Sequence, residues 1–370
     1  MSAAAREALA GAAGNGAGRL RDAAWDPELD PGARNAVFTC LAVRPGESCL
    51  LITDEDTLPI GAALAAQFRQ ATDRFRAFVL EDVAPRPLER FPEPIARAME
   101  AADVTCYAAS ARRGELRARM QMTEIVDRRR IRHAHMVAIT ERIMTEGMRA
   151  DFLEVDALSR WALERARRAR EIRVTSPAGT DLSARFSPAL RWVKTSGLIS
   201  AEAWGNLPGG EIFTCPAGVD GVYVCDGVLG DWFAAVYGDL RGSPVSFRIA
   251  GARVVGVECA RDDLRRDVEA YIATDENSSR VGEFALGTNL AVTNVIGHIL
   301  QDEKMPGVHV AFGHPYREHT GADWTSGTHV DAVGRECDVW IDDLQVIRRG
   351  RYLVDPAELP RAPEPAPRPA

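Results

Sequence analysis

The hydrophobic pattern changes near residue 170, and this change constrains the fold more than any other feature. Residues 35–140 alternate short apolar runs with amphipathic stretches, whereas the later apolar runs come in pairs joined by Gly or Pro turns. Alternating strand and helix patterns are typical of a parallel sheet, and closely spaced strands are typical of hairpins. The sequence therefore predicts an α/β fold: an N-terminal parallel-sheet βαβ domain followed by a C-terminal mixed, largely antiparallel α+β domain.

The N-terminal half carries the strand–helix rhythm. Strands are expected over 37–43, 48–53, 75–80, 104–107 and 132–140, and helices over 59–74 and 92–102. No Gly-x-Gly-x-x-Gly or P-loop motif occurs at the turns, so a nucleotide site is not supported. His133 and His135 lie in the last of these strands, and we interpret them as structural.

The second half carries hairpin signals over 171–186 and 244–259 and a strand–turn–strand pattern over 206–224. A long amphipathic helix over 145–169 precedes them, and a polar helix over 261–274 follows. The N-terminus is rich in Ala and Gly without the apolar core of a signal peptide. We predict a flexible tail over 1–34, the α/β domain over 35–140, a bridging helix within 141–172, the metal-binding domain over 173–355 and a Pro-rich tail over 356–370.

Composition excludes several classes of protein. No apolar run approaches the ~20 residues of a membrane span. The formal net charge of -8 argues against a nucleic-acid binder. The seven cysteines are odd in number and show no Cys-x-x-Cys spacing, which favours reduced thiols. We therefore expect a cytoplasmic protein with no membrane or nucleic-acid partner.

Residues 282–331 hold five of the seven histidines, with acids among them. These histidines are His298, His309, His314, His319 and His329, and the acids include Glu283, Asp302, Glu303 and Asp331. Imidazole and carboxylate together suit zinc, manganese, iron or cobalt. Because carboxylates are in the majority, a two-metal hydrolytic site is the natural interpretation.

The histidines differ in their promise as ligands. His309 and His329 lie in short strand-like runs, and in an extended segment His329 and Asp331 share one face. His298 lies in an apolar stretch and is expected to pack, whereas His314 and His319 lie in a polar loop. Glu211 follows Pro208-Gly209-Gly210, and on pattern alone it is more typical of a surface acid at the exit of a turn.

Five ordered motifs resemble the aminopeptidase T and aminopeptidase S family of metallopeptidases. They are GTDL (179–182), LPGGEIFTCP (207–216), GEFALGTN (282–289), DEKMPGVHVAFG (302–313) and HVD (329–331). The resemblance implies a two-domain homodimer with a dinuclear metal centre. It implies metal ligands at Glu211, Glu283, His309, His329 and Asp331, with Glu283 bridging. Glu303 would be a further ligand or the general base, and Tyr316 would be the active-site tyrosine.

The implied activity is metal-dependent hydrolysis of an amide bond in a small molecule or short peptide that bears an amine. The metal would be zinc, cobalt or manganese. One residue more separates Glu303 from His309 than in the family, and the loop 315–328 is compact.

Two other functions stay open. The region from His329 to Asp343 is also similar to 2,5-dihydroxypyridine dioxygenase, which uses one iron(II) held by two histidines and an aspartate. That enzyme has a histidine where this chain has Glu283 and no acid at the position of Glu211, so the ligands favour a hydrolase. The third function is a binding protein that keeps the metal scaffold without turnover.

Overall fold

The computed structural model describes residues 14–202 and 204–362. Within them the chain divides into two compact units, unit 1 and unit 2. Unit 1 contains residues up to Leu153 together with Gly197–Gly209, and unit 2 contains Glu154–Ser196 and the chain from Gly210. One sheet of the structure is parallel and two are antiparallel, so the predicted combination of an α/β and an α+β domain is confirmed.

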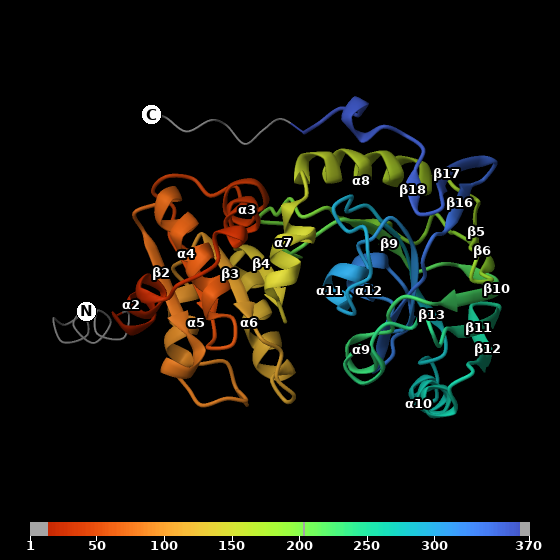
Figure 1. Ribbon diagram of the computed structural model, residues 1–370, viewed down its shortest axis with the longest axis horizontal. Helices are drawn as coiled ribbons and strands as arrows, with labels where there is room; N and C mark the ends of the chain where they lie inside the picture. Colours follow the sequence, from red (N-terminus) through yellow and green to blue (C-terminus); the bar gives the residue numbers. More distant parts are fainter. Residues whose placement is uncertain (1–13, 203, 363–370) are drawn as a thin grey trace. The chain divides into compact units, whose positions relative to one another are not determined.

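Unit 1 is built on a five-stranded parallel sheet with the order β2-β1-β3-β4-β8 (Figure 1). Its strands are β1 (Cys49–Thr53), β2 (Phe75–Val79), β3 (Val104–Ala109), β4 (Arg132–Val137) and β8 (Gly205–Asn206). Helices α4 (Leu58–Ala71), α5 (Glu93–Met99) and α6 (Leu116–Arg129) connect the first four strands. Leu50 and Ile52 share a core cluster with α5 and α6. Since side chains alternate along a strand, Leu51 faces the side on which α4 contacts β1.

The carboxyl ends of β1 and β3, where such a sheet usually binds ligands, carry a closed polar network. The buried Asp54 carboxylate accepts hydrogen bonds from the backbone amides of Thr57 (2.9 Å) and Ser110 (2.8 Å) and pairs with Arg86. Arg86 also pairs with the buried Glu115. Because these charges satisfy one another, the network is a structural link between strands.

Residues 14–40 differ from the prediction. The expected tail contains α2 (Gly14–Asp22), η1 (Pro27–Leu29) and α3 (Asp30–Arg34), and Leu20 and Leu29 are buried. The strand predicted over 37–43 is wrong, because Asn35–Cys40 forms the helical turn η2. Its buried residues Ala36, Val37 and Cys40 follow helical spacing, and a short apolar run cannot distinguish helix from strand. Residues 1–13 of the expected tail lie outside the described residues.

Unit 1 is completed by short elements. They are η3 (Leu80–Asp82), α7 (Glu141–Thr145) and η4 (Gly147–Arg149). The long helix expected over 145–169 is therefore shorter in the structure, where α8 spans Phe152–Ala166.

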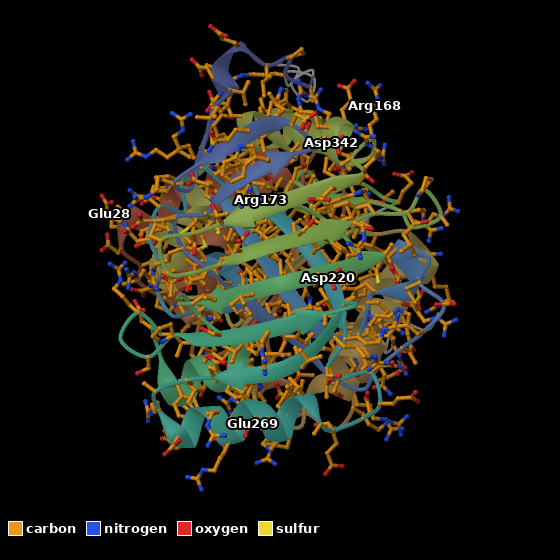
Figure 2. All side chains as sticks on the ribbon, turned by 90° about the vertical axis from the view of Figure 1, so that its right-hand side faces the viewer. Glu28, Arg168, Arg173, Asp220, Glu269 and Asp342 are labelled. Carbon is orange, nitrogen blue, oxygen red and sulfur yellow. The ribbon has the colours of Figure 1, made fainter. Side chains whose placement is uncertain are left out.

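Unit 2 contains an eight-stranded antiparallel sheet with the order β12-β11-β10-β6-β5-β16-β17-β18. Its strands are β5 (Glu171–Thr175), β6 (Asp181–Arg185), β10 (Gly218–Cys225), β11 (Val245–Ala250), β12 (Arg253–Glu258), β16 (Asp338–Ile341), β17 (Leu344–Arg348) and β18 (Arg351–Tyr352). The predicted hairpins correspond to β5–β6 and β11–β12. Figure 2 shows the outer face, on which Arg173 and Asp220 lie. The opposite face buries Ile172, Val174 and Leu182.

The second sheet of unit 2 has five antiparallel strands in the order β15-β14-β13-β9-β7. They are β7 (Val193–Thr195), β9 (Glu211–Thr214), β13 (Val281–Gly287), β14 (Gly307–Gly313) and β15 (His329–Val333). One face packs into the core through residues such as Phe284, Val310 and Phe312. The helices of unit 2 are α8, α9 (Asp231–Tyr237), α10 (Asp262–Ile272), α11 (Ile299–Asp302), α12 (Arg317–Thr320) and η5 (Pro356–Glu358).

All seven cysteines are free thiols, and all but Cys259 are buried. Among the described residues, no helix has the length and apolar character needed to cross a membrane.

Candidate metal centre

The β15-β14-β13-β9-β7 sheet of unit 2 carries the predicted ligands on the face that points away from the core. Glu283 on β13 lies opposite Ala311 on β14, and Ala311 lies opposite Asp331 on β15. His309 lies two residues before Ala311 on β14, and His329 two residues before Asp331 on β15. Directly opposed residues and residues two apart share a face of an antiparallel sheet. Strand alternation thus places the four side chains together, although their positions span almost fifty residues.

Glu211 reaches the same face from β9. It lies opposite Gly287 at the end of β13. A side chain at Gly287 would clash, because an added Cβ would lie 1.9 Å from the backbone oxygen of Met305. Glycine at this position therefore lets the segment of Glu303 and Lys304 approach the sheet, beside Glu211.

The six acids and histidines form three overlapping groups. Their ligand atoms lie within 4.8 Å of one another in each group. The groups are Glu211, Glu283 and His309; Glu283, His329 and Asp331; and Glu303, His309 and Asp331. The structure thus brings together every predicted ligand and the predicted catalytic acid.

The Glu283 carboxylate lies between the two histidines. Its Oε1 is 3.4 Å from Nε2 of His309, and its Oε2 is 3.9 Å from Nε2 of His329. His329 Nε2 also lies 3.2 Å from Oδ1 of Asp331, and His309 Nε2 lies 3.7 Å from Oε2 of Glu211. Each oxygen of Glu283 is therefore shared with a different set of ligands.

Lys304 is a member of this site that the sequence did not reveal. Its ammonium lies 2.5 Å from Oε1 of Glu211 and 2.5 Å from Oε1 of Glu303, and the residue is only 1% exposed. Thr195 Oγ1 also donates to Oε1 of Glu211 at 2.9 Å. A lysine next to an Asp-Glu pair normally reaches water, so nothing in the local sequence signals its burial.

Only one of the two oxygens of the Glu211 carboxylate therefore accepts hydrogen bonds. Its Oε1 accepts from Lys304 and Thr195, whereas its Oε2 is buried and has no hydrogen-bond partner among the described residues. An unpartnered buried carboxylate oxygen is costly. Because this oxygen faces His309 and Glu283, a divalent cation held by all three side chains fits the donor set.

The electrostatics also suit a cation. Burial by itself would lower the pKa of His309 and His329, but Glu283 beside His309 and Asp331 beside His329 raise them to about 9 and about 10. Burial raises the pKa of Glu303 to about 8 against the pull of Lys304. Although burial opposes it, His329 holds the pKa of Asp331 down at about 2. The carboxylates thus create a strongly negative field between the histidines, which a divalent ion would neutralise.

Second contacts orient His329. Its Nδ1 lies 3.0 Å from the backbone oxygen of His314, so a proton on Nδ1 leaves Nε2 free toward the acids. The hydroxyl of Tyr271 donates a hydrogen bond to the backbone carbonyl of His329 at 3.0 Å, which also fixes the main chain of His329.

Tyr316 covers one side of the site. Its ring centroid lies 4.8 Å from that of His329 and 5.8 Å from that of Phe213. Its backbone is left-handed, with a φ of 46°, which is uncommon for an aromatic residue and typical of functional positions. No hydrogen bond joins its hydroxyl to another described residue, and the residue as a whole is 38% exposed. The hydroxyl is therefore available to a substrate.

The remaining predicted candidates lie elsewhere or act indirectly. His298 and His319 belong to none of the three groups. The Asp302 carboxylate accepts from the amides of Ile296, Gly297 and His298 at 2.8–3.1 Å, so it holds the loop before Glu303.

His133 and His135 lie in unit 1, on β4. His133 Nδ1 lies 2.7 Å from Oγ1 of Thr105, and both rings pack edge-on against Trp204. Their packing supports the structural role predicted for them.

Comparisons with known proteins agree with this geometry. Residues 158–336 match the family described as thermophilic metalloprotease (M29). Among curated proteins no match is found. Two solved structures share the fold. AmpT from Thermus thermophilus is 20% identical, with a TM-score of 0.63, covering 88% of this chain and 99% of that one. The 2,5-dihydroxypyridine dioxygenase from Pseudomonas putida KT2440 is 16% identical, with a TM-score of 0.63, covering 88% and 97%.

The family match spans β5 to β15 and includes all six site residues. The resemblance seen in the sequence motifs is thus confirmed. Residues 158–336 carry a thermophilic metalloprotease (M29) domain, and the chain is accordingly a metallo-hydrolase.

Proposed function

We propose that the chain hydrolyses an amide bond in a small, amine-bearing substrate, using two divalent ions. The observation that carries this proposal is the position of Glu283, whose two oxygens face different histidines. One ion would be held by Glu211, Glu283 and His309, and the other by Glu283, His329 and Asp331. When bound, such ions polarise the scissile carbonyl and acidify a water molecule toward neutral pH.

Glu303 is the proposed general base. Its Oε1 is held by Lys304 at 2.5 Å, which fixes the carboxylate and leaves the other oxygen to accept a proton from water. The group that it forms with His309 and Asp331 places it beside both proposed ion sites. The same oxygen could bind an ion as a further ligand, and substitution of Glu303 distinguishes these roles by its effect on metal content.

Tyr316 is the proposed donor to the oxyanion. Its ring packs against His329, and its hydroxyl has no partner in the described part of the chain. A donor of this kind stabilises the charge that develops on the carbonyl oxygen during attack.

Zinc, cobalt or manganese would suit this donor set. The candidate ligands are four carboxylates and two imidazoles, all neutral or anionic donors of nitrogen and oxygen. The compact loop 315–328 favours a small substrate over a folded protein.

The alternative is a ring-cleaving dioxygenase with one iron(II) ion. It receives weight from the shared fold with 2,5-dihydroxypyridine dioxygenase. A mononuclear iron site of this type needs two histidines and one carboxylate together. None of the three groups of described residues contains both His309 and His329. Ligand geometry therefore supports the hydrolase more than the dioxygenase.

The test compares both activities on one preparation. The metal content of purified protein is measured, and the protein is loaded with zinc, cobalt, manganese or, without oxygen, iron(II). We expect release of the amine from aminoacyl p-nitroanilides and no oxygen uptake with 2,5-dihydroxypyridine. Oxygen uptake with iron and inactivity on a broad amide panel would favour the dioxygenase. A metal-loaded protein inert in both assays would favour a binding protein.

A further inference from the structure

Unit 2 contains a cavity of about 770 Å³ that is lined by none of the six proposed metal-site residues. Its walls come from five segments of unit 2. They are the loop after α9, the loop between β13 and α11, the link between α11 and β14, the turn between β15 and β16, and the β17–β18 hairpin with the chain beyond it. This volume is that of a pocket for a ligand of a few dozen atoms.

The charge of the cavity is opposite to that of the chain. Its charged residues are four arginines and two acids, Arg241, Arg335, Arg349, Arg351, Asp239 and Glu336. The whole chain has 45 basic and 53 acidic residues, so a surplus of arginine here is a local feature. The surplus of two positive charges creates an attraction for anions.

Both acids are already engaged. Asp239 pairs with Nη2 of Arg335 at 2.7 Å, and Glu336 accepts from Nε of Arg349 at 2.8 Å. The exposed guanidinium groups of Arg241 and Arg351 have no acidic partner among the residues that the structure describes. Two cations from separate loops therefore face the cavity without neutralisation.

The cavity is built on a fixed framework. Arg335 is 7% exposed, and its backbone amide donates to Oδ1 of Asp226 at 2.8 Å. Glu336 and Arg349 have left-handed backbones, with φ values of 49° and 48°. Such conformations in residues other than glycine persist where the surroundings hold them, often around ligands.

The rest of the lining is largely apolar. It includes Leu290, Val292, Val295, Met305 and Tyr352. A bare inorganic ion would contact only the arginines and leave this surface in water. We propose that the cavity binds an organic anion, in which a negatively charged group meets Arg241 and Arg351 and an apolar body covers the remaining wall.

The proposed ligand would also contact segments that lead to the metal centre. Met305 follows Lys304 directly, and Tyr352 donates its hydroxyl to the carbonyl of Gly287 at 2.9 Å. A bound anion would therefore restrain residues 288–306, the segment between Glu283 and His309. Slower hydrogen exchange in that segment is the expected second signature.

The test is a titration of the metal-loaded protein with benzenesulfonate. Its weakly basic oxygens compete poorly for divalent ions, so the metal centre contributes little to the signal. Calorimetry should show that wild type binds benzenesulfonate saturably. Hydrogen exchange of residues 288–306 should be slower in the bound protein. The double variant R241Q/R351Q should bind at least about tenfold more weakly. Neither position touches a proposed metal ligand, so metal content should not change.

The matched control is R168Q/R173Q, which removes two exposed arginines of unit 2 outside the cavity (Figure 2). It should bind like wild type. Equal loss of affinity in both double variants would reveal a general charge effect and overturn the site. Benzyl alcohol and inorganic sulfate should each bind far more weakly than benzenesulfonate. Sulfate binding as tight as that of benzenesulfonate would contradict an organic ligand. An R241Q/R351Q variant that binds benzenesulfonate as tightly as wild type would show that the ligand does not bind in this cavity.

Discussion

Two features of individual residues define the chemistry of the site. Lys304 neutralises one oxygen each of Glu211 and Glu303, and the other oxygen of Glu211 lies 3.7 Å from Nε2 of His309. Glu283 presents its two oxygens to His309 and His329. The lysine therefore leaves Glu211 a single oxygen for a metal ion, whereas Glu283 has two.

Substitution K304M should destabilise the protein in the absence of added metal. It leaves two buried carboxylates without their cation, and breaking a buried pair costs about 3–5 kcal/mol of unfolding free energy. Urea unfolding in chelator measures this change. The control R265M breaks the exposed pair with Glu269, and it should cost at most about 1 kcal/mol. A K304M protein as stable as R265M would show that Lys304 is not the counter-charge.

Substitution Y316F removes only a hydroxyl. If Tyr316 donates to the oxyanion, kcat should fall by about 100-fold with unchanged metal content. Steady-state kinetics and metal analysis measure the two quantities. The matched variant Y237F loses a hydroxyl that bonds to Asp267 on the surface, and its kcat should equal that of wild type. Full turnover by Y316F would remove Tyr316 from the mechanism.

At the scale of elements, the sequence predicted the candidate metal ligands better than the residues that hold them in place. His309 and the His329-x-Asp331 pair lie in strands that their apolar alternation foretold, and antiparallel pairing then brings them to one face. Glu211 was assigned to the site by resemblance alone, since its own neighbours resemble a surface turn. The burial of Lys304 was not predictable, because it depends on Gly287 and the approach of a distant segment.

The errors in the elements have a common physical cause. A strand was predicted over 37–43, where Asn35–Cys40 forms a helical turn. Helix α6 lies in a stretch that was assigned to no element. The first is a short apolar run. The second is highly charged, and its apolar face is narrow, with Ala118, Met122 and Val126 buried. In both, packing against the rest of unit 1 decides the conformation, and local pattern alone does not carry that information.

Two buried histidines on β4, His133 and His135, should make the stability of unit 1 depend on pH. Burial lowers the pKa of His135 to about 3 and that of His133 well below its ordinary value. The unfolded chain takes up these protons near pH ~6.5. Their contribution to stability is therefore complete above pH ~6.5 and is lost as the pH falls toward 3, by up to about 1.4 kcal/mol per pH unit for each histidine.

Hydrogen exchange of the β3 and β4 amides at pH 5 and pH 7 measures this dependence. H135Q should reduce the difference in opening free energy between the two pH values. H319N replaces an exposed histidine of unit 2 and should leave it unchanged. An equal pH dependence in wild type and H135Q would mean that His135 does not stay neutral in the folded state.

At the scale of the whole molecule, resemblance to the metallopeptidases predicts a homodimer. Sedimentation at micromolar concentration should then show a species of twice the mass of one chain. A single species with the mass of one chain would contradict this prediction. The dimer is not needed for the proposed metal centre, because unit 2 of one chain supplies all six residues.

The account as a whole depends on a centre for two ions in unit 2. Glu283 is the residue that distinguishes it from a single-ion site, because only a carboxylate there offers one oxygen to each group. The matched control is E269Q, a change to an exposed glutamate on α10 (Figure 2).

The most direct measurement is the metal content and amide hydrolysis of E283Q beside wild type and E269Q. We predict two ions per chain in wild type and E269Q, and at most one ion, with hydrolysis abolished, in E283Q. Circular dichroism should show that the variant is folded. Full metal content and full turnover in E283Q would contradict the bridging role of Glu283 and with it the dinuclear centre proposed here.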